Sequence, residues 1–305
     1  MKYLLVILFI FILKADLNLK KLLENEVILI GEYHYFTKND SIQYKIINDI
    51  IKDNRFKNYD ILLEYPPELE YYISRNDTAG IRKYFIYNKD SRFIANEMSS
   101  YNKLRFAFVS KLFALKNTNI SVKCIDTHYT IRPIYYTILY IINKYKVFPE
   151  CFSNDISNII EIKNISQSDI NTYDSLKGYF LSNKKIIKSN IEEFDYKSLE
   201  TIFNTPLYNF QNYKSLDRDK YMFNRVKDCY SSDKQIIAIL GNAHIKDNSS
   251  KNLYRLLSRK YNVLNKKKVS TISIVITKND SISLSKFYDY MIVNSNGEYI
   301  FKNCN

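Results

Sequence analysis

The chain contains three histidines among its 305 residues, and each follows an apolar run typical of a β-strand. They are His34 after residues 26–30, His128 after residues 120–125 and His244 after residues 236–240. Imidazole titrates near neutrality, so it can take a proton from water or bind a metal. A fourth apolar run ends on a carboxylate, Glu64. Because ligands bind outside the carboxyl ends of the strands in an open α/β sheet, we expect these groups at one shared site.

Two of the histidines share the motif Gly-x-x-His, in Gly31-Glu32-Tyr33-His34 and in Gly241-Asn242-Ala243-His244. Glycine permits a tight backbone turn at the end of a strand. A neighbouring carboxylate such as Glu32 orients an imidazole and raises its basicity. The backbone N–H groups after Gly241 would open a helix and favour an anion or an oxyanion. The alternative for the first motif is a helix-capping Glu32 beside a half-buried His34.

Glu64 and a basic helix supply the remaining charged groups. A carboxylate at the end of an apolar strand is costly unless it is paired or functional. In Arg218-Asp219-x-x-Met222-x-x-Arg225, residues 218, 222 and 225 fall on one helical face. Arg218 would hold Glu64 or clamp an anionic group with two hydrogen bonds. The alternatives are a helix-capping role for Glu64 and a surface ion pair for Arg218.

The elements that position these groups alternate between strands and helices. Strands are predicted at residues 26–30, 60–64, 120–126, 236–240 and 269–277, with a further strand at 288–293. The alternation predicts an α/β fold with a mostly parallel central sheet flanked by helices and right-handed crossovers. Residues 133–212 interrupt it with mixed polar and apolar helical patterns. We predict one α/β domain over residues 17–305, whose largely helical insertion at 133–212 caps the carboxyl ends of the strands.

Composition excludes several classes of protein. The hydrophobic fraction of 46% and charged fraction of 25% are ordinary for a globular chain, which excludes global disorder. The net charge is +13, but the basic residues are spread along the chain and residues 266–268 form the only tight lysine run. The aromatic residues do not interleave with basic residues as in an RNA-binding module, so we predict no nucleic-acid partner.

The N-terminus resembles a secretory signal. Lys2 precedes an apolar run over residues 3–13, which is too short for a membrane span of about 20 residues. Ala15 is the candidate cleavage position. We predict a signal peptide or N-terminal anchor at residues 1–16 and an exported protein, either periplasmic, secreted or held by an uncleaved leader with peripheral membrane association. The alternative is a buried N-terminal strand or helix.

Taken in order, the motifs resemble a known superfamily. Gly-Glu-x-His, Leu-Glu, Arg-Asp-x-x-Met and Gly-x-x-His follow one another as in the erythromycin esterase-like, ChaN-type haem-binding and TraB/TIKI proteins. The resemblance covers roughly residues 25–275 and matches the insertion poorly. It implies a polar centre formed by Glu32, His34, Glu64, Arg218 and His244. Asp126, His128 and Arg225 are further candidates for binding.

The resemblance implies three activities. In the favoured one, the chain hydrolyses an ester or amide bond in a small-molecule or peptide substrate and requires no cofactor. His34 activates water, Glu32 and Glu64 orient it, and His244 with Arg218 stabilises the oxyanion. In a TIKI-type protease, Glu32, His34 and His244 would bind a divalent metal. A ChaN-type protein would bind haem or another ligand at the cell envelope without catalysis.

Overall fold

A computed structural model gives the fold of most of the chain. It describes residues 24–32, 39–53, 55–87, 98–115, 119–128, 130–161, 166–207, 215–231, 233–245, 253, 256–257, 269–275, 290–295 and 298–303. The predicted leader at residues 1–16, the lysine run at 266–268 and His34 lie outside these ranges. The described helices include none with the length and apolar character of a membrane span.

The chain forms two compact units, which are described one at a time. The sheet unit comprises Met1–Glu64, Ala114–Lys123 and Asp219–Asn305. The helical unit comprises Tyr65–Phe113 and Cys124–Arg218. The helical unit therefore includes the whole of the predicted insertion at 133–212 together with earlier segments of the chain.

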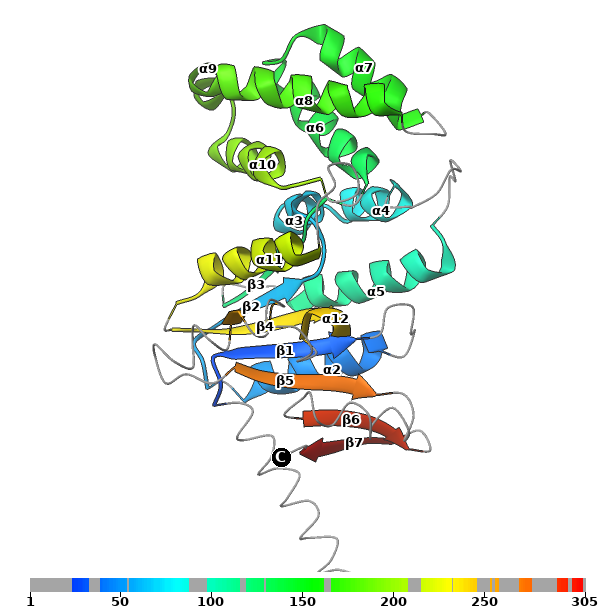
Figure 1. Cartoon of the computed structure of the whole chain (residues 1–305), viewed down its shortest axis with the longest axis vertical. Coiled ribbons are helices and arrows are strands. Elements are labelled where there is room, and N and C mark those ends of the chain that lie inside the picture. Colours follow the sequence, from blue (N-terminus) through cyan, green and yellow to red (C-terminus); the bar gives the residue numbers. More distant parts are fainter. Residues whose placement is uncertain are drawn as a thin grey trace, which may run out of the picture. The chain divides into compact units, whose positions relative to one another are not determined.

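The sheet unit is built on seven strands (Figure 1). They are β1 (Val27–Glu32), β2 (Asn58–Leu63), β3 (Ile120–Cys124), β4 (Lys234–Gly241), β5 (Val269–Val275), β6 (Tyr290–Ser295) and β7 (Glu298–Asn303). Their order in the sheet is β3-β2-β4-β1-β5-β6-β7. The pairs β2–β4, β4–β1, β1–β5 and β5–β6 are parallel, and β7 adds an antiparallel edge strand. The predicted α/β fold with a mostly parallel sheet is confirmed.

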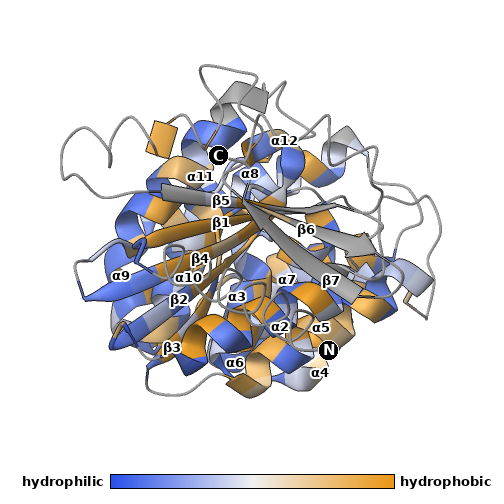
Figure 2. Cartoon of the chain, turned by 90° about the horizontal axis from the view of Figure 1, so that it is seen from below, coloured by the Kyte–Doolittle hydropathy of each residue, from blue (hydrophilic) through white to orange (hydrophobic). Residues whose placement is uncertain are grey.

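The three central strands are buried along almost their whole length. Every residue of β1 is buried, as is every residue of β2 and β4 after the first. Parallel strands covered on both faces read as continuous runs of Ile, Leu and Val, as in Ile236 to Leu240. Figure 2 shows β1 and β4 as mainly hydrophobic strands. This rigid centre fixes the strand ends, where the polar side chains emerge.

The described part of the sheet unit also contains helices. Among them are α2 (Asn39–Lys52), the part of α11 (Ser215–Cys229) that begins at Asp219, and the short α12 (Asn242–Ile245). Met222 and Val226 of α11 are buried one turn apart, which gives the helix an apolar face. Helix α12 follows β4 directly and contacts β1 and β4. Together these helices place side chains around the ends of β1, β2 and β4.

The helical unit contains most of the remaining helices. They are α3 (Pro67–Ser74), α4 (Thr78–Tyr87), most of α5 (Ser100–Leu115), α6 (Ile131–Tyr145), α7 (Glu150–Glu161), α8 (Gln167–Ser182), α9 (Lys184–Asn190) and α10 (Glu193–Asn204). The described residues of 133–212 are almost entirely helical, as predicted, although α6 begins two residues earlier. That this segment caps the strand ends stays a prediction.

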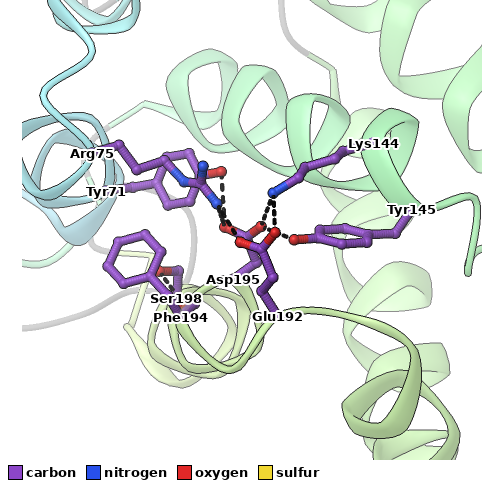
Figure 3. A network of polar contacts seen from close by, with 8 residues as sticks. All are labelled: Tyr71, Arg75, Lys144, Tyr145, Glu192, Phe194, Asp195 and Ser198. Atoms are coloured by element: carbon purple, nitrogen blue, oxygen red, sulfur yellow. Dashed lines mark hydrogen bonds and ion pairs between the residues drawn. The ribbon is translucent and has the colours of Figure 1, made fainter.

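A buried carboxylate joins three segments of the helical unit (Figure 3). Asp195 of α10 has no exposed side-chain surface. It accepts hydrogen bonds from Arg75 Nη2 at 2.5 Å, Lys144 Nζ at 3.2 Å, Tyr71 Oη at 3.1 Å and Tyr145 Oη at 2.5 Å. Burial alone would raise the pKa of Asp195, but the hydrogen bonds from Tyr145, Arg75 and Lys144 outweigh it and lower that pKa. The ionised carboxylate therefore ties α10 to α3 and α6.

Candidate functional site

Strand register brings three polar segments to one edge of the sheet. Glu32, the last residue of β1, lies opposite Gly241, the last residue of β4. On the other side of β4, the backbone N–H of Glu64 donates to the carbonyl of Ile239 at 3.2 Å. Because β1, β4 and β2 are neighbours and parallel, their carboxyl ends coincide. Glu32, Glu64 and the Gly241–His244 turn are therefore adjacent within the sheet unit.

His244 lies between two carboxylates at this edge. Its Nδ1 is hydrogen-bonded to Asp219 of α11, and its Nε2 lies 3.2 Å from Oε1 of Glu64. The side chains are 8% exposed for His244, 9% for Asp219 and 7% for Glu64, so water reaches only their margins. We call these three residues the His244 cluster. The arrangement fixes the ring from both sides.

Glu64 also accepts a hydrogen bond from the backbone of the turn that carries His244. The backbone N–H of Gly241 donates to Oε2 of Glu64. One carboxylate thus accepts the N–H at the end of β4 while its other oxygen faces the imidazole. The sequence predicted an anion at this turn, and in the structure the anion beside Gly241 is the protein's own Glu64. Buried carboxylates need such partners because an uncompensated charge is costly inside a protein.

The hydrogen-bonding partners of His244 restrict its protonation state. A neutral imidazole carries one N–H, whereas an imidazolium carries two. With both carboxylates ionised, only the imidazolium donates to each of them. An Asp–His pair of this kind holds the ring in one orientation and stabilises the charged form, as in hydrolytic triads. The His244 cluster is therefore suited to holding a positive charge or moving a proton at the end of β4.

Helix α2 holds the side chain of Glu32. Its residue is 3% exposed, and its carboxylate accepts a hydrogen bond from Nε2 of the fully buried Gln43 on α2. His34 follows two residues later in the sequence, outside the described residues. Glu32 thus has a fixed orientation at the strand end where the sequence places the first histidine.

Arg218 and Asp126 form a buried pair in the helical unit. Arg218 Nε donates to Oδ1 of Asp126 at 2.7 Å, and Nη2 donates to Oδ2 at 2.6 Å. The backbone N–H of Thr127 adds a third bond to Oδ1 at 2.7 Å. The predicted bidentate clamp is present on a carboxylate of the chain itself. The sequence indicated both residues separately but did not predict this pairing.

His128 is part of the interior of the helical unit. Its residue has no exposed surface, and its Nδ1 lies 2.8 Å from Oε2 of the buried Glu68. Nε2 lies 2.9 Å from the carbonyl oxygen of Ile202, and its backbone N–H donates to Pro206. Because the ring is enclosed and both nitrogens face protein atoms, the structure gives His128 a structural role in place of the predicted ligand contact. Arg225 is half-buried on α11, and its binding role stays a prediction.

Solved structures of the same architecture exist. A mutant of the erythromycin esterase EreC in its open conformation superposes with a TM-score of 0.53 and 13% identity, over 93% of this chain and 78% of that one. A Bacillus cereus protein superposes with a TM-score of 0.51 and 15% identity, over 92% and 71%. The chain has the erythromycin esterase-like fold.

The predicted resemblance is thus confirmed for the fold. ChaN of Campylobacter jejuni, solved with cofacially bound haem, matches with a TM-score of 0.42 and 17% identity over 93% of this chain and 91% of that one. No protein-family model matches the sequence, and no curated protein matches it. At sequence identities this low, the comparisons establish the fold alone. The chemistry of the site has to be inferred from the residues of this chain.

The predicted metal set would lie at the same edge of the sheet. No group of three or more His, Cys, Asp and Glu side chains is arranged to hold a metal ion within the described part of the chain. His244 has Asp219 at one ring nitrogen and Glu64 near the other, so a carboxylate of the protein faces each of its nitrogens. His34 lies outside the described residues, so the metal set of Glu32, His34 and His244 stays a prediction.

Three buried residues near the predicted groups were missed from the sequence. Asp219 was read only as part of the Arg-Asp motif, although an Asp next to a candidate site arginine is itself a signal. Glu68 follows Glu64 by four residues in the sequence, in the first turn of α3, so a second carboxylate soon after the strand was itself a signal. Gln43 gave no signal, because a polar residue on an amphipathic helix ordinarily faces solvent.

Proposed function

We propose that the chain is a hydrolase that cleaves an ester or amide bond in a small-molecule or peptide substrate. The observation that carries this proposal is the His244 cluster, in which an imidazole is held between Asp219 and Glu64 at the end of β4. Buried groups of opposite charge at a strand end of an α/β sheet are where such folds place chemistry. The fold is shared with an erythromycin esterase, which supports the reaction class and leaves the substrate open.

The proposed reaction divides the work between two histidines. His34 removes a proton from water as the water oxygen attacks the carbonyl carbon, while Glu32 orients the ring. The carbonyl π electrons move to oxygen and form an oxyanion. His244, held as an imidazolium by its two carboxylates, supplies the positive charge that stabilises this oxyanion. Collapse of the intermediate breaks the bond to the leaving group, which receives the proton carried by His34.

The two histidines should differ in the rate loss that follows their replacement. General-base help contributes about 10²–10⁴-fold to the rate, so His34→Ala should lose turnover by that factor. Removing one donor to an oxyanion costs about 10²–10³-fold in kcat. His244→Gln should therefore retain more activity than His34→Ala and leave the affinity for a ground-state analogue unchanged.

A panel of chromogenic esters and matched anilides, graded by acyl length, tests the proposal on the purified full chain. We expect turnover of at least one ester by the wild type and its loss in His34→Ala, with the thermal midpoint unchanged. Equal turnover in wild type and His34→Ala would remove the mechanism.

Two further arms test the rival activities. Turnover that disappears on exhaustive dialysis against a chelator and returns with a divalent metal would replace the proposal with a metal-dependent protease. A Soret band on haem titration, together with no turnover of any substrate, would replace it with a haem-binding protein.

A further inference from the structure

The junction between α8 and α9 exposes two aliphatic side chains. Asn183 is both the C-cap of α8 and the N-cap of α9, so the chain turns a corner there (Figure 1). On either side of it, Leu181 is 45% exposed and Ile186 is 62% exposed. These are the two largest exposures among the large hydrophobic residues that the structure describes. We call residues 177–190 the α8–α9 corner.

The corner is firmly packed on its inner side. Phe180 and Ile187, each adjacent in sequence to an exposed aliphatic residue, are buried to 1% and 0% exposure. The Phe180 ring lies 5.0 Å from that of Phe203 and 5.7 Å from that of Tyr196, measured between centroids. Leu181 and Ile186 therefore point outward from an ordered corner.

The charged residues within the corner itself all have one sign. Between residues 175 and 191 the sequence contains four lysines, at 177, 184, 185 and 188, and no Asp or Glu. Lys184 pairs with Glu200 at 3.2 Å, and Lys188 lies over the Tyr196 ring. Lys185 is exposed directly beside Ile186. The corner thus combines exposed aliphatic tips with a local surplus of positive charge.

We propose that the α8–α9 corner docks on the surface of an anionic lipid bilayer. Leu181 and Ile186 would enter the boundary between headgroups and acyl chains, while the lysines would lie at the phosphate level. Long lysine side chains bury their stems and keep the ammonium in water, which suits that depth. A protein partner is the less favoured occupant, because protein interfaces centre on Trp, Tyr and Arg, whereas the corner presents Leu, Ile and Lys.

The absence of Trp from the chain provides a local probe. We would place a single Trp at the corner in Ile186→Trp and, as a matched control, at Leu104 of α5, an aliphatic residue of the helical unit that is 38% exposed. Both full-length variants carry the same N-terminal apolar run, so its membrane affinity cannot distinguish them. With vesicles containing phosphatidylglycerol, we expect a blue shift and quenching by brominated acyl chains for Ile186→Trp alone.

Two more arms test the charge. In the Ile186→Trp background, Lys177→Gln with Lys185→Gln should weaken partitioning to anionic vesicles by about tenfold or more. Vesicles of phosphatidylcholine alone should give a much smaller shift. Equal shifts for Ile186→Trp and Leu104→Trp, or none for Ile186→Trp, would overturn the proposal, as would binding that ignores both lysines and the anionic lipid.

Discussion

The two described histidines, His244 and His128, each lie beside a carboxylate, yet the two units use them differently. His128 in the helical unit has no exposed surface and meets one carboxylate, Glu68, and one backbone carbonyl. His244 in the sheet unit meets two carboxylates and keeps 8% of its side chain exposed. A pair that is closed on every side can only hold structure together, whereas a charged group at a strand end can also reach a ligand.

The number of acidic partners adds to this difference. His128 has one carboxylate, Glu68, near Nδ1 and the neutral carbonyl of Ile202 at Nε2. His244 has a carboxylate at each ring nitrogen and keeps a small exposed surface at the end of β4. Functional sites often hold ionisable groups in such charged surroundings. A histidine that lies close to a glutamate is therefore not enough to identify a functional site.

The largest expected effect comes from breaking the enclosed pair. Glu68→Ala leaves the fully buried His128 ring without its neighbouring carboxylate, and a buried polar group left without its partner costs about 1–3 kcal/mol, more if it is charged. Denaturant unfolding should show a loss of this size, while kcat per folded molecule stays unchanged. In a double-mutant cycle, adding His128→Ala should cost much less than it does in the wild type. Additive losses would mean that the two residues do not act as a pair.

The second effect is on catalysis. His244→Gln should lower kcat/KM by about 10²–10³-fold on whichever ester the chain cleaves, because it removes the charge but keeps a hydrogen-bond donor. Asp219→Asn should act in the same direction by loosening the ring. His128→Gln is the matched control, and its folded fraction should keep wild-type kcat/KM. If His128→Gln were the variant that lost turnover at unchanged stability, the roles assigned to the two histidines would be reversed.

How far the sequence predicted these regions depends on the distance over which the contacts act. The strands were predictable because buried parallel strands such as β1 and β4 have continuous apolar runs, a local signal. The polar groups at their ends followed from the same runs. The order of the parallel strands was not predictable, because pairing between distant segments leaves no mark in either one. The antiparallel β7 was missed, although Asn296-Gly297 between residues 290–295 and 298–303 is the sequence signal of a two-residue hairpin.

Contacts that depend on helix docking were also out of reach. Asp219 reaches His244 only because α11 packs on the sheet unit with Met222 inward. Glu68 meets His128 only inside the helical unit, whose two segments the sequence showed as separate parts of one domain. Thus Glu64 and His244 could be named in advance, whereas Asp219 and Glu68, which distinguish the two described histidines, could not.

The third prediction uses pH to separate stability from activity. Because hydrogen bonds lower the pKa of Asp195, its contribution to stability is present above the ordinary aspartate pKa and is lost as pH falls through the folded value, below about pH 4. Burial would lower the pKa of Lys144, but its bonds to Tyr145, Glu192 and Asp195 raise it, so its contribution is lost only at strongly alkaline pH.

Asp195→Asn should therefore destabilise the chain by about 1–3 kcal/mol at neutral pH and by much less near pH 2. Unfolding curves measured across this range test the pH dependence. A loss of stability that does not change with pH would show that the charge of Asp195 contributes nothing.

The smallest expected effects come from removing one hydroxyl group in each unit. Tyr71→Phe removes one hydroxyl from Asp195 while Arg75, Lys144 and Tyr145 remain, and the ring keeps its stacking on Phe194 at 5.7 Å. A hydrogen bond to a charged group contributes about 1.5–3 kcal/mol at most, but three donors to Asp195 remain, so the unfolding midpoint should fall only slightly.

Tyr230→Phe is the matched deletion in the sheet unit, because the Tyr230 hydroxyl donates to Glu26 just before β1 begins. We expect a similar small loss of stability and no change in kcat/KM for either variant. Glu26 lies at the amino end of β1, opposite to the end that carries Glu32, so a catalytic effect there would have to act along the whole strand. A fall in turnover for Tyr71→Phe alone would instead assign the Asp195 network a part in the reaction. Full burial of a charged group would then no longer distinguish a structural role from a functional one in this chain.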